Sequence, residues 1–190
     1  MGDNRKNTMI ALLLGALVIM AVAYAAFSTA LNINGTASIN STWNVAFDET
    51  KTQAENGVVS PTTGTGGTTA PSGTVSYTDG QHAVINATLN QPGDSVVFTL
   101  TVKNTGSINA TLGAITTGAT SGCTCSGSTC TSTGGHIQFT VGSFSTTSLA
   151  ATNGTATIQV TATFLNTDVS SLTAAESATI SVSFTATQAS

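Results

Sequence analysis

The sequence has few charged residues, and few of these are basic. Only 6% of its 190 residues are charged, with four Lys and Arg against eight Asp and Glu. Beyond the N-terminal segment the basic residues are Lys51 and Lys103 alone, whereas binding to nucleic-acid phosphates requires clustered cations. We therefore predict no nucleic-acid partner. Because 40% of the residues are hydrophobic, the chain also lacks the composition of a disordered protein.

Residue groupings typical of metal and catalytic sites are also missing. The two histidines, His82 and His136, have no further ligands at a spacing that a metal site would need. The adjacent pair Asp48 and Glu49 lies at a predicted strand end and fits a solvated turn. Neither a G-x-S-x-G nucleophile elbow nor a phosphate-binding loop sequence occurs. We therefore predict no enzymatic activity, no metal and no cofactor.

The N-terminus is predicted to form a hydrophobic helix that serves as an export signal, residues 1–25. Arg5 and Lys6 precede an uninterrupted apolar run that begins at Met9, as in the n- and h-regions of a signal peptide. A following A-x-A pattern predicts cleavage by signal peptidase after Ala25. The alternative is a retained anchor, because the run to Phe27 could span roughly 30 Å of hydrocarbon. Both readings predict a secreted or cell-surface protein that contacts the membrane only through this segment.

Beyond residue 26, apolar residues alternate with Thr, Ser and Gln along segments of strand length. This period of two is typical of strands with one buried face, and Thr and Val favour sheets. About seven to nine such segments, separated by turn residues such as the "QPGD" of 91–94, predict a single all-β domain over residues 26–190. The expected architecture is an antiparallel two-sheet sandwich of jelly-roll or immunoglobulin-like type. Residues predicted on buried faces are Leu31, Ile33, Ala37, Ile39, Trp43, Val45, Phe47, Ala83, Ile85, Ala87, Leu89, Val96, Phe98, Leu100, Val102, Ala110, Leu112, Ala114, Ile137, Phe139, Val141, Ala156, Ile158, Val160, Ala162, Phe164, Ala178, Ile180, Val182, Phe184 and Ala186.

One stretch departs from this alternation. Residues 52–72, "TQAENGVVSPTTGTGGTTAPS", are rich in Thr, Gly and Pro. Apolar residues with a core-forming period do not occur in it, and turn-forming residues do. The composition therefore predicts a long exposed loop.

Three cysteines, Cys123, Cys125 and Cys130, lie in one stretch rich in Gly, Ser and Thr. In an exported chain the default expectation is a disulfide. Either Cys123 or Cys125 could pair with Cys130, whereas a Cys123–Cys125 ring is too tight to be favoured. So small a loop adds little stability, and the disulfide is expected to order a hairpin tip rather than hold the fold. The third thiol is either free or bonded to a neighbouring subunit.

The chain also contains N-x-S/T sequons, which are candidate glycosylation sites. Such sequons also arise by chance in a chain this rich in Thr. The asparagines are Asn34, Asn40, Asn86, Asn109 and Asn153.

Three stretches carry a resemblance to a known family. In "AYAAFST" a strand follows the predicted cleavage site directly. In "QPGDSVVFTLTVKNTGSINATL", residues 91–112, a strand that begins at Gly-Asp is followed by an Asn-x-Gly-Ser turn. The chain ends in a pair of Thr-rich alternating strands. In these features it resembles the TasA/camelysin family of prokaryotic extracellular fibre subunits, which includes related archaeal bundling pilins. It differs from the family in its low charge, its cysteine cluster and its long Thr/Gly loop.

The resemblance implies a structural subunit of an extracellular filament or biofilm matrix whose partner is a second copy of itself. In that family the N-terminal segment of one subunit completes the sheet of the next. Here the candidate donor strand is 26–39, whose contact residues would be Phe27, Leu31, Ile33, Ala37 and Ile39. Each fully buried Leu or Ile would contribute roughly 1.5–3 kcal/mol, and the strand's amides would pair with an open sheet edge. Such a head-to-tail contact generates a filament.

Other interpretations of the sequence stay open. The segment 26–39 could instead be the first strand of its own sandwich. The whole protein could be a non-polymerising surface adhesin or binding module. A third alternative is a type IV pilin-like subunit that keeps its apolar helix, against which the A-x-A site and the lack of a Glu early in the apolar run argue.

Overall fold

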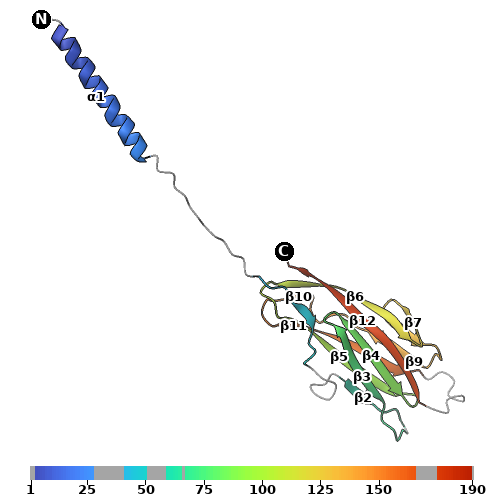
Figure 1. Ribbon diagram of the computed structural model, residues 1–190. Coiled ribbons are helices and arrows are strands. Elements are labelled where there is room, and N and C mark those ends of the chain that lie inside the picture. The colour runs from blue at the N-terminus through green and yellow to red at the C-terminus, as the bar shows by residue number, and fades with distance from the viewer. Residues whose placement is uncertain (1–2, 28–40, 51–58, 66, 166–174, 190) are drawn as a thin grey trace. The chain divides into compact units, whose positions relative to one another are not determined.

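The computed structural model describes residues 3–27, 41–50, 59–65, 67–165 and 175–189 of the chain. The chain divides into two compact units, Met1–Ile39 and Asn40–Ser190. The first unit contains the helix α1 (Asp3–Phe27), and the second contains all of the described strands (Figure 1).

Helix α1 has the length and composition of a signal sequence or a membrane anchor. It is 25 residues long, and its large apolar side chains between Met9 and Val22 are exposed on every side. A helix that is apolar all round needs apolar surroundings. Within the described ranges, α1 is the one helix long and apolar enough to cross a membrane. The apolar N-terminal segment is thus confirmed as a helix, while its cleavage stays a prediction.

The strands form two antiparallel sheets that share one core, and this confirms the predicted two-sheet sandwich. All of the pairings are antiparallel. Sheet A has the order β1 (Val45–Phe47), β5 (Ser95–Asn104), β11 (Gly154–Phe164), β9 (Ile137–Val141), β8 (Thr129–Ser132) and β7 (Cys123–Ser126), with β2 (Val59–Thr62) also on β5. Sheet B has the order β10 (Ser148–Leu149), β6 (Ala110–Ser121), β12 (Glu176–Gln188), β4 (His82–Leu89) and β3 (Ser72–Asp79).

The period-two pattern places the core correctly, with few exceptions. Every described residue that we predicted on a buried face is buried except Trp43, Ala114 and Ala186, of which Ala186 is half-buried. Trp43 is 43% exposed. It lies before the first residue of β1, in a segment that borders the loop after β5, where Thr105 N donates a hydrogen bond to Asn44 O. Ala114 is exposed because a register shift in the β6–β12 pairing breaks the alternation. The buried-face predictions for 31–39 lie outside the described residues.

The prediction of an exposed loop over 52–72 is wrong in two places: Pro71 is buried and Ser72 begins β3, and four residues form a strand. Val59–Thr62 forms β2, which pairs with β5 from Phe98 to Ser95. The missed strand has one half-buried apolar residue, Val59, and exposed neighbours, so it leaves no alternation to detect. Its Pro61 is tolerated because β2 lies at the edge of sheet A. Residues 51–58 and 66 lie outside the described part.

A fully buried carboxylate stands immediately before β5. Asp94 accepts backbone hydrogen bonds from Gly64 N at 2.7 Å, Asn90 N at 2.8 Å and Gln91 N at 3.1 Å. The predicted turn at 91–94 is present: Asp94 N donates to Gln91 O, and Gly93 has the positive φ of 85° that a type II turn requires. The carboxylate of the "PGD" motif thus ties two loops to the start of the strand.

A fully buried amide closes the other end of β5. Asn104 Nδ2 donates to Ile108 O at 2.8 Å and Ala150 O at 3.2 Å, and its Oδ1 accepts from Gly106 N at 3.0 Å. One side chain therefore joins the β5–β6 loop to the β10–β11 loop. Because an unpaired buried amide is costly, these contacts explain the physical role of the "NTGS" turn.

Candidate functional site

Among the described strands, none covers much of one edge of β6. It pairs with β12 along its length on one side, whereas on the other side β10 covers Ala110 and Thr111 alone. In the part of the chain that the structure describes, no strand pairs with residues 113–121 on that side. Register shifts in the β6–β12 pairing are typical of edge strands. The unpaired N–H and C=O groups of such an edge can pair with an incoming strand.

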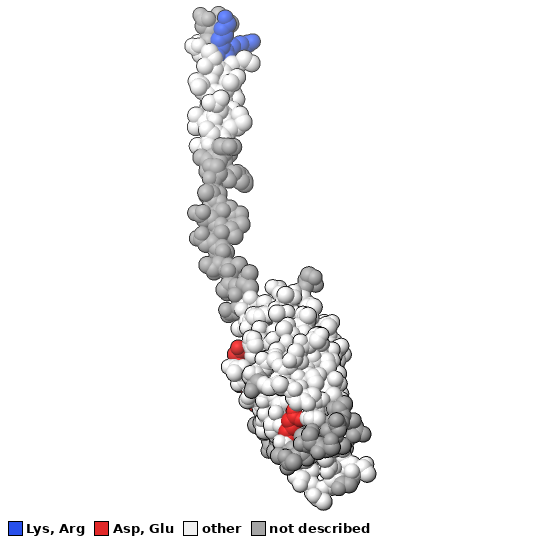
Figure 2. Space-filling view, turned by 90° about the vertical axis from the view of Figure 1, so that its right-hand side faces the viewer, with Lys and Arg blue, Asp and Glu red and all other residues white. Residues whose placement is uncertain are grey.

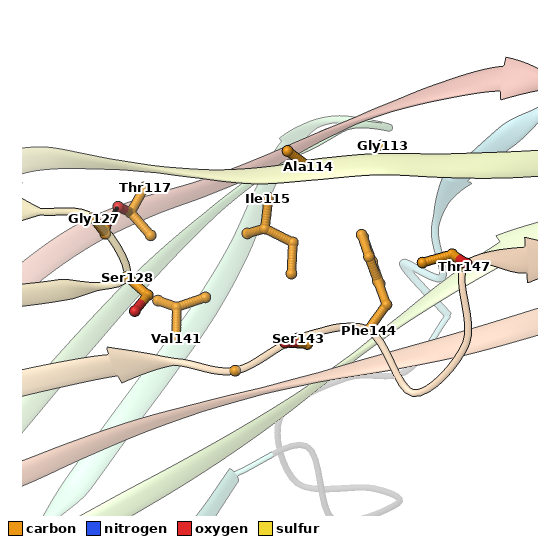
Figure 3. A pocket seen from close by; sticks show the side chains of 11 residues that line it. Gly113, Ala114, Ile115, Thr117, Gly127, Ser128, Val141, Ser143, Phe144 and Thr147 are labelled. Atoms are coloured by element: carbon orange, nitrogen blue, oxygen red, sulfur yellow. Dashed lines mark hydrogen bonds between the residues drawn. The ribbon is translucent and has the colours of Figure 1, made fainter.

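A groove of about 380 Å³ lies beside this edge, between β6 and the chain that connects β9 to β10. Its large apolar side chains are Ile115, Val141 and Phe144, and Figure 3 shows Ile115 projecting from β6 between the other two. The rest of the lining is small, which leaves room for side chains from outside; it consists of Gly113, Ala114, Thr117, Gly127, Ser128, Gly142, Ser143 and Thr147. The groove can therefore take apolar side chains from a strand that pairs with β6.

A row of aromatic rings holds Phe144 in place. The ring of Phe144 packs edge-to-face on Phe184 of β12, with centroids 5.9 Å apart, and Phe184 packs the same way on Phe47 at 5.0 Å. Phe47 in turn lies 5.5 Å from Tyr77 of β3, whose pKa is raised mainly by burial and also by two nearby carboxylates. Edge-to-face pairs contribute about 0.5–1.5 kcal/mol beyond burial. Phe144 is thus fixed in position although it lies in a loop and is only half-buried.

The tip of the β7–β8 hairpin forms one wall of the groove. Gly127 O accepts a hydrogen bond from Thr117 Oγ1 of β6 at 2.6 Å, and Ser128 O accepts one from Val141 N of β9 at 2.8 Å. The tip is therefore hydrogen-bonded to sheet B through Gly127 and to sheet A through Ser128.

A disulfide joins Cys125 to Cys130 across this hairpin, where the two residues lie opposite each other. This is one of the two pairings that the sequence left open. Cys123 is a free, half-buried thiol. Burial is the main reason that its pKa lies above the ordinary range, and the nearby Glu176 carboxylate adds to the shift. The Cys123 thiol is consequently a weak nucleophile near neutral pH.

The predicted donor strand falls largely outside the described residues. Leu31, Ile33, Ala37 and Ile39 lie there, so their placement stays a prediction. Phe27, which we predicted as the first contact residue of the strand, is the last residue of α1 in this uncleaved chain. Sequence reasoning missed the groove itself. The one available signal was Phe144, a single large aromatic residue in the otherwise polar stretch "GSFSTTS".

The candidate glycosylation sites differ in their surroundings. Asn86 is half-buried in β4, and its Nδ2 donates to Thr179 Oγ1 at 2.8 Å. Asn109 and Asn153 are exposed in turns that precede β6 and β11. Asn34 and Asn40 lie outside the described residues. Of the three that can be placed, the two in turns are thus the more accessible.

The two histidines lie apart from the groove. His82 Nδ1 lies 2.7 Å from Asp79 Oδ1 in an exposed hydrogen bond at the β3–β4 turn. The ring of His136 stacks on Phe164, with centroids 5.9 Å apart. Among the described residues no three His, Cys, Asp or Glu side chains come together in an arrangement that could hold a metal ion.

The surface of the β domain carries little charge. On the face shown in Figure 2, Asp and Glu atoms appear in a few places on the domain and Lys and Arg atoms appear on the N-terminal helix alone. Polar uncharged residues take the outward positions of β11, namely Thr155, Thr157, Gln159, Thr161 and Thr163. A surface of this kind offers little electrostatic repulsion to a second copy.

Comparisons of the chain with protein-family models, with curated proteins and with solved structures return no match.

Proposed function

We propose that the chain is a structural subunit of an extracellular filament or biofilm matrix, which polymerises by donor-strand exchange. Residues 26–39 of one copy would pair with the open edge of β6 in the next copy and place their apolar side chains in the adjoining groove. The proposal rests mainly on the edge of β6 over 113–121 that faces away from β12, which no described strand covers, and on the adjoining groove with the apolar residues Ile115, Val141 and Phe144. Secretion and a jelly-roll or immunoglobulin-like topology are parts of the same proposal.

The energetics favour an extended donor with alternating apolar residues. Backbone pairing with β6 gives affinity, and side chains on one face of the donor enter the groove. Fully burying each Leu or Ile contributes roughly 1.5–3 kcal/mol, which together exceed ordering costs of a few kcal/mol. Because donor and acceptor lie on different parts of the chain, the contact is heterologous and repeats without closing.

Cleavage of the leader would control when the donor becomes available. Helix α1 runs through the predicted cleavage site and ends at Phe27. Processing after Ala25 would leave two residues of this helix, Ala26 and Phe27, which are too few to sustain a helical turn. The segment 26–39 would then be free to pair as a strand with another copy.

One observation favours a second candidate function, a pilin-like subunit that retains its helix. Helix α1 is apolar on every side, as a filament core or a membrane anchor requires. N-terminal sequencing of the assembled protein separates the two functions. A start at Ala26 supports strand exchange, and a start upstream of Met9 supports a retained helix.

The decisive experiment alters donor and acceptor separately. The processed chain, a variant lacking 26–39 and the variant Ile115→Lys are compared by sedimentation and negative-stain microscopy. We expect filaments from the unaltered chain and none from either variant, because the first has no donor and the second places a charge in the groove. Thr74→Lys on β3, at the opposite edge of sheet B, is the matched control and should assemble normally. Undiminished assembly without 26–39 would overturn the proposal.

A further inference from the structure

We propose that the Cys125–Cys130 disulfide makes assembly depend on oxidation, by fixing the hairpin tip that walls the groove. This inference rests on the proposed function and concerns how the same site is regulated. The disulfide would determine the shape of the groove and contribute little to the stability of the whole domain.

The geometry places the disulfide directly behind the wall. Cys125 and Cys130 are opposite each other in the β7–β8 register, and the tip between them includes Gly127 and Ser128, both of which line the groove. Among the described residues, this is the one disulfide that cross-links the hairpin. The disulfide therefore encloses the two residues whose carbonyl groups receive the hydrogen bonds from Thr117 and Val141.

Strand β7 has few other restraints. It is four residues long and stands last in the order of sheet A, so that β8 is its one strand partner among the described residues. Cys125 on β7 is half-buried, whereas Cys130 on β8 is fully buried. An isolated two-stranded hairpin is marginally stable in water. The disulfide thus fastens the loosely held strand to a residue that the core already holds.

The bond adds little to global stability. The loop that it closes is short, with a separation of five residues along the chain, and the entropy removed from the unfolded chain by so small a ring is small. Cys130 belongs to the core and Cys125 packs against it, but most of the core residues lie on strands that the disulfide does not join. Breaking the bond should therefore release the hairpin tip and leave the sandwich folded.

Formation of the Cys125–Cys130 disulfide makes the shape of the groove depend on whether the protein is inside or outside the cytoplasm. The thiols of Cys125 and Cys130 lose two protons and two electrons, and an oxidised protein disulfide outside the cytoplasm takes them up to become a dithiol. Cytoplasmic conditions keep such thiols reduced. In the cytoplasm the acceptor would have a loose wall, and donor binding would have to order it. Export would complete the groove, so that subunits become competent to assemble where filaments are needed.

The test uses chemical reduction together with cysteine variants of the full processed chain. The variant C123A/C125A leaves the buried Cys130 in place and removes every thiol that could pair with it. C123A alone keeps the disulfide and is the matched control. Wild-type protein treated with dithiothreitol also lacks the disulfide but carries no substitution. Circular dichroism checks that each sample is folded, and sedimentation follows assembly.

We expect assembly to be about tenfold slower for C123A/C125A and for reduced wild type, because ordering the released tip then opposes binding. C123A should match oxidised wild type, and dithiothreitol should not slow C123A/C125A further. Hydrogen exchange supplies a readout that does not depend on assembly. The Val141 amide should lose protection in the reduced samples, while the amides that join β5 and β11 keep theirs.

The outcomes separate the two proposals. Equal assembly rates for oxidised and reduced protein, or an unchanged Val141 amide, would overturn the role of the disulfide while filaments still form through 26–39. If oxidised wild type forms no filaments, the proposed function fails and redox control of assembly fails with it. Loss of Val141 amide protection on reduction would then show that the disulfide orders the groove wall but does not control assembly.

Discussion

Strands β5 and β6 follow each other in the chain, yet they are held in quite different ways. β5 pairs with β11 along its whole length and with β1 and β2 on its other side. Buried polar side chains, Asp94 and Asn104, secure its two ends. β6 has one full-length partner, a two-residue contact with β10 and register shifts along its length.

The difference shows that a strand's neighbours, rather than its composition, decide its role. Both strands are rich in Thr and in apolar residues, and their intrinsic preference for sheets is similar. β5 is placed where both edges are covered, so it forms the centre of the core. β6 keeps an exposed edge, which suits it to bind a further strand.

The largest difference in unfolding free energy is expected between truncations of apolar side chains on the two strands. Phe98 of β5 is fully buried and packs against Gly73 of β3, where an added Cβ would clash with the ring. Phe98→Ala should lower the free energy of unfolding by about 3–5 kcal/mol. Ile115→Ala on β6 should cost only about 1 kcal/mol, since Ile115 is half-buried. Urea unfolding measures both, and equal losses would contradict the contrast.

The next largest effect concerns the buried carboxylate at the start of β5. Asp94→Asn replaces an acceptor oxygen with an N–H donor that faces backbone N–H groups. We expect a loss of about 1–3 kcal/mol in the free energy of unfolding, because at least one buried donor loses its acceptor. The control is Asp79→Asn, whose side chain is exposed and which should leave the urea midpoint unchanged. A midpoint shift of the same size in both variants would refute the role of burial.

A smaller effect is expected where β6 contacts the hairpin tip. Thr117→Val removes the hydroxyl that donates to Gly127 O at nearly constant volume. We predict a loss of about 0.5–1.5 kcal/mol, together with faster hydrogen exchange at the Val141 amide. Thr116→Val, at an exposed neighbouring position, is the control. If both variants exchange alike, the contact between tip and strand contributes nothing to order.

The smallest effect lies at the β3–β4 turn, away from both strands. The pKa of Asp79 is lowered, mainly by its hydrogen bond with His82 and further by Gln81 N. A lowered folded pKa means that the interaction contributes stability above the ordinary carboxyl pKa of 3.8 and loses it as pH falls through the folded value. In His82→Ala, NMR titration should show the Asp79 pKa rise towards 3.8. Exposed pairs contribute little, so stability at neutral pH should not change.

The sequence predicted the core well because burial alternates strictly in β4, β11 and most of β12. It failed where backbone irregularity decides the outcome. The register shift near Ala114 and Ile115 depends on pairing with β12, and β2 depends on a free edge of β5. The groove is lined by β6 and by a loop almost thirty residues later in the chain. No local sequence pattern predicts that these two segments lie side by side. The cysteine pairing likewise needed the β7–β8 register, which places Cys125 rather than Cys123 opposite Cys130.

Trp43 has a practical consequence for following this protein in solution. It is the only tryptophan of the chain, it is 43% exposed, and it lies a few residues after the segment that would pass to another copy. Its fluorescence therefore reports on the junction between the leading segment and the β domain without any added dye. A blue shift of the emission on mixing would signal that a neighbour has displaced water from the indole, which turns growth kinetics into an optical measurement.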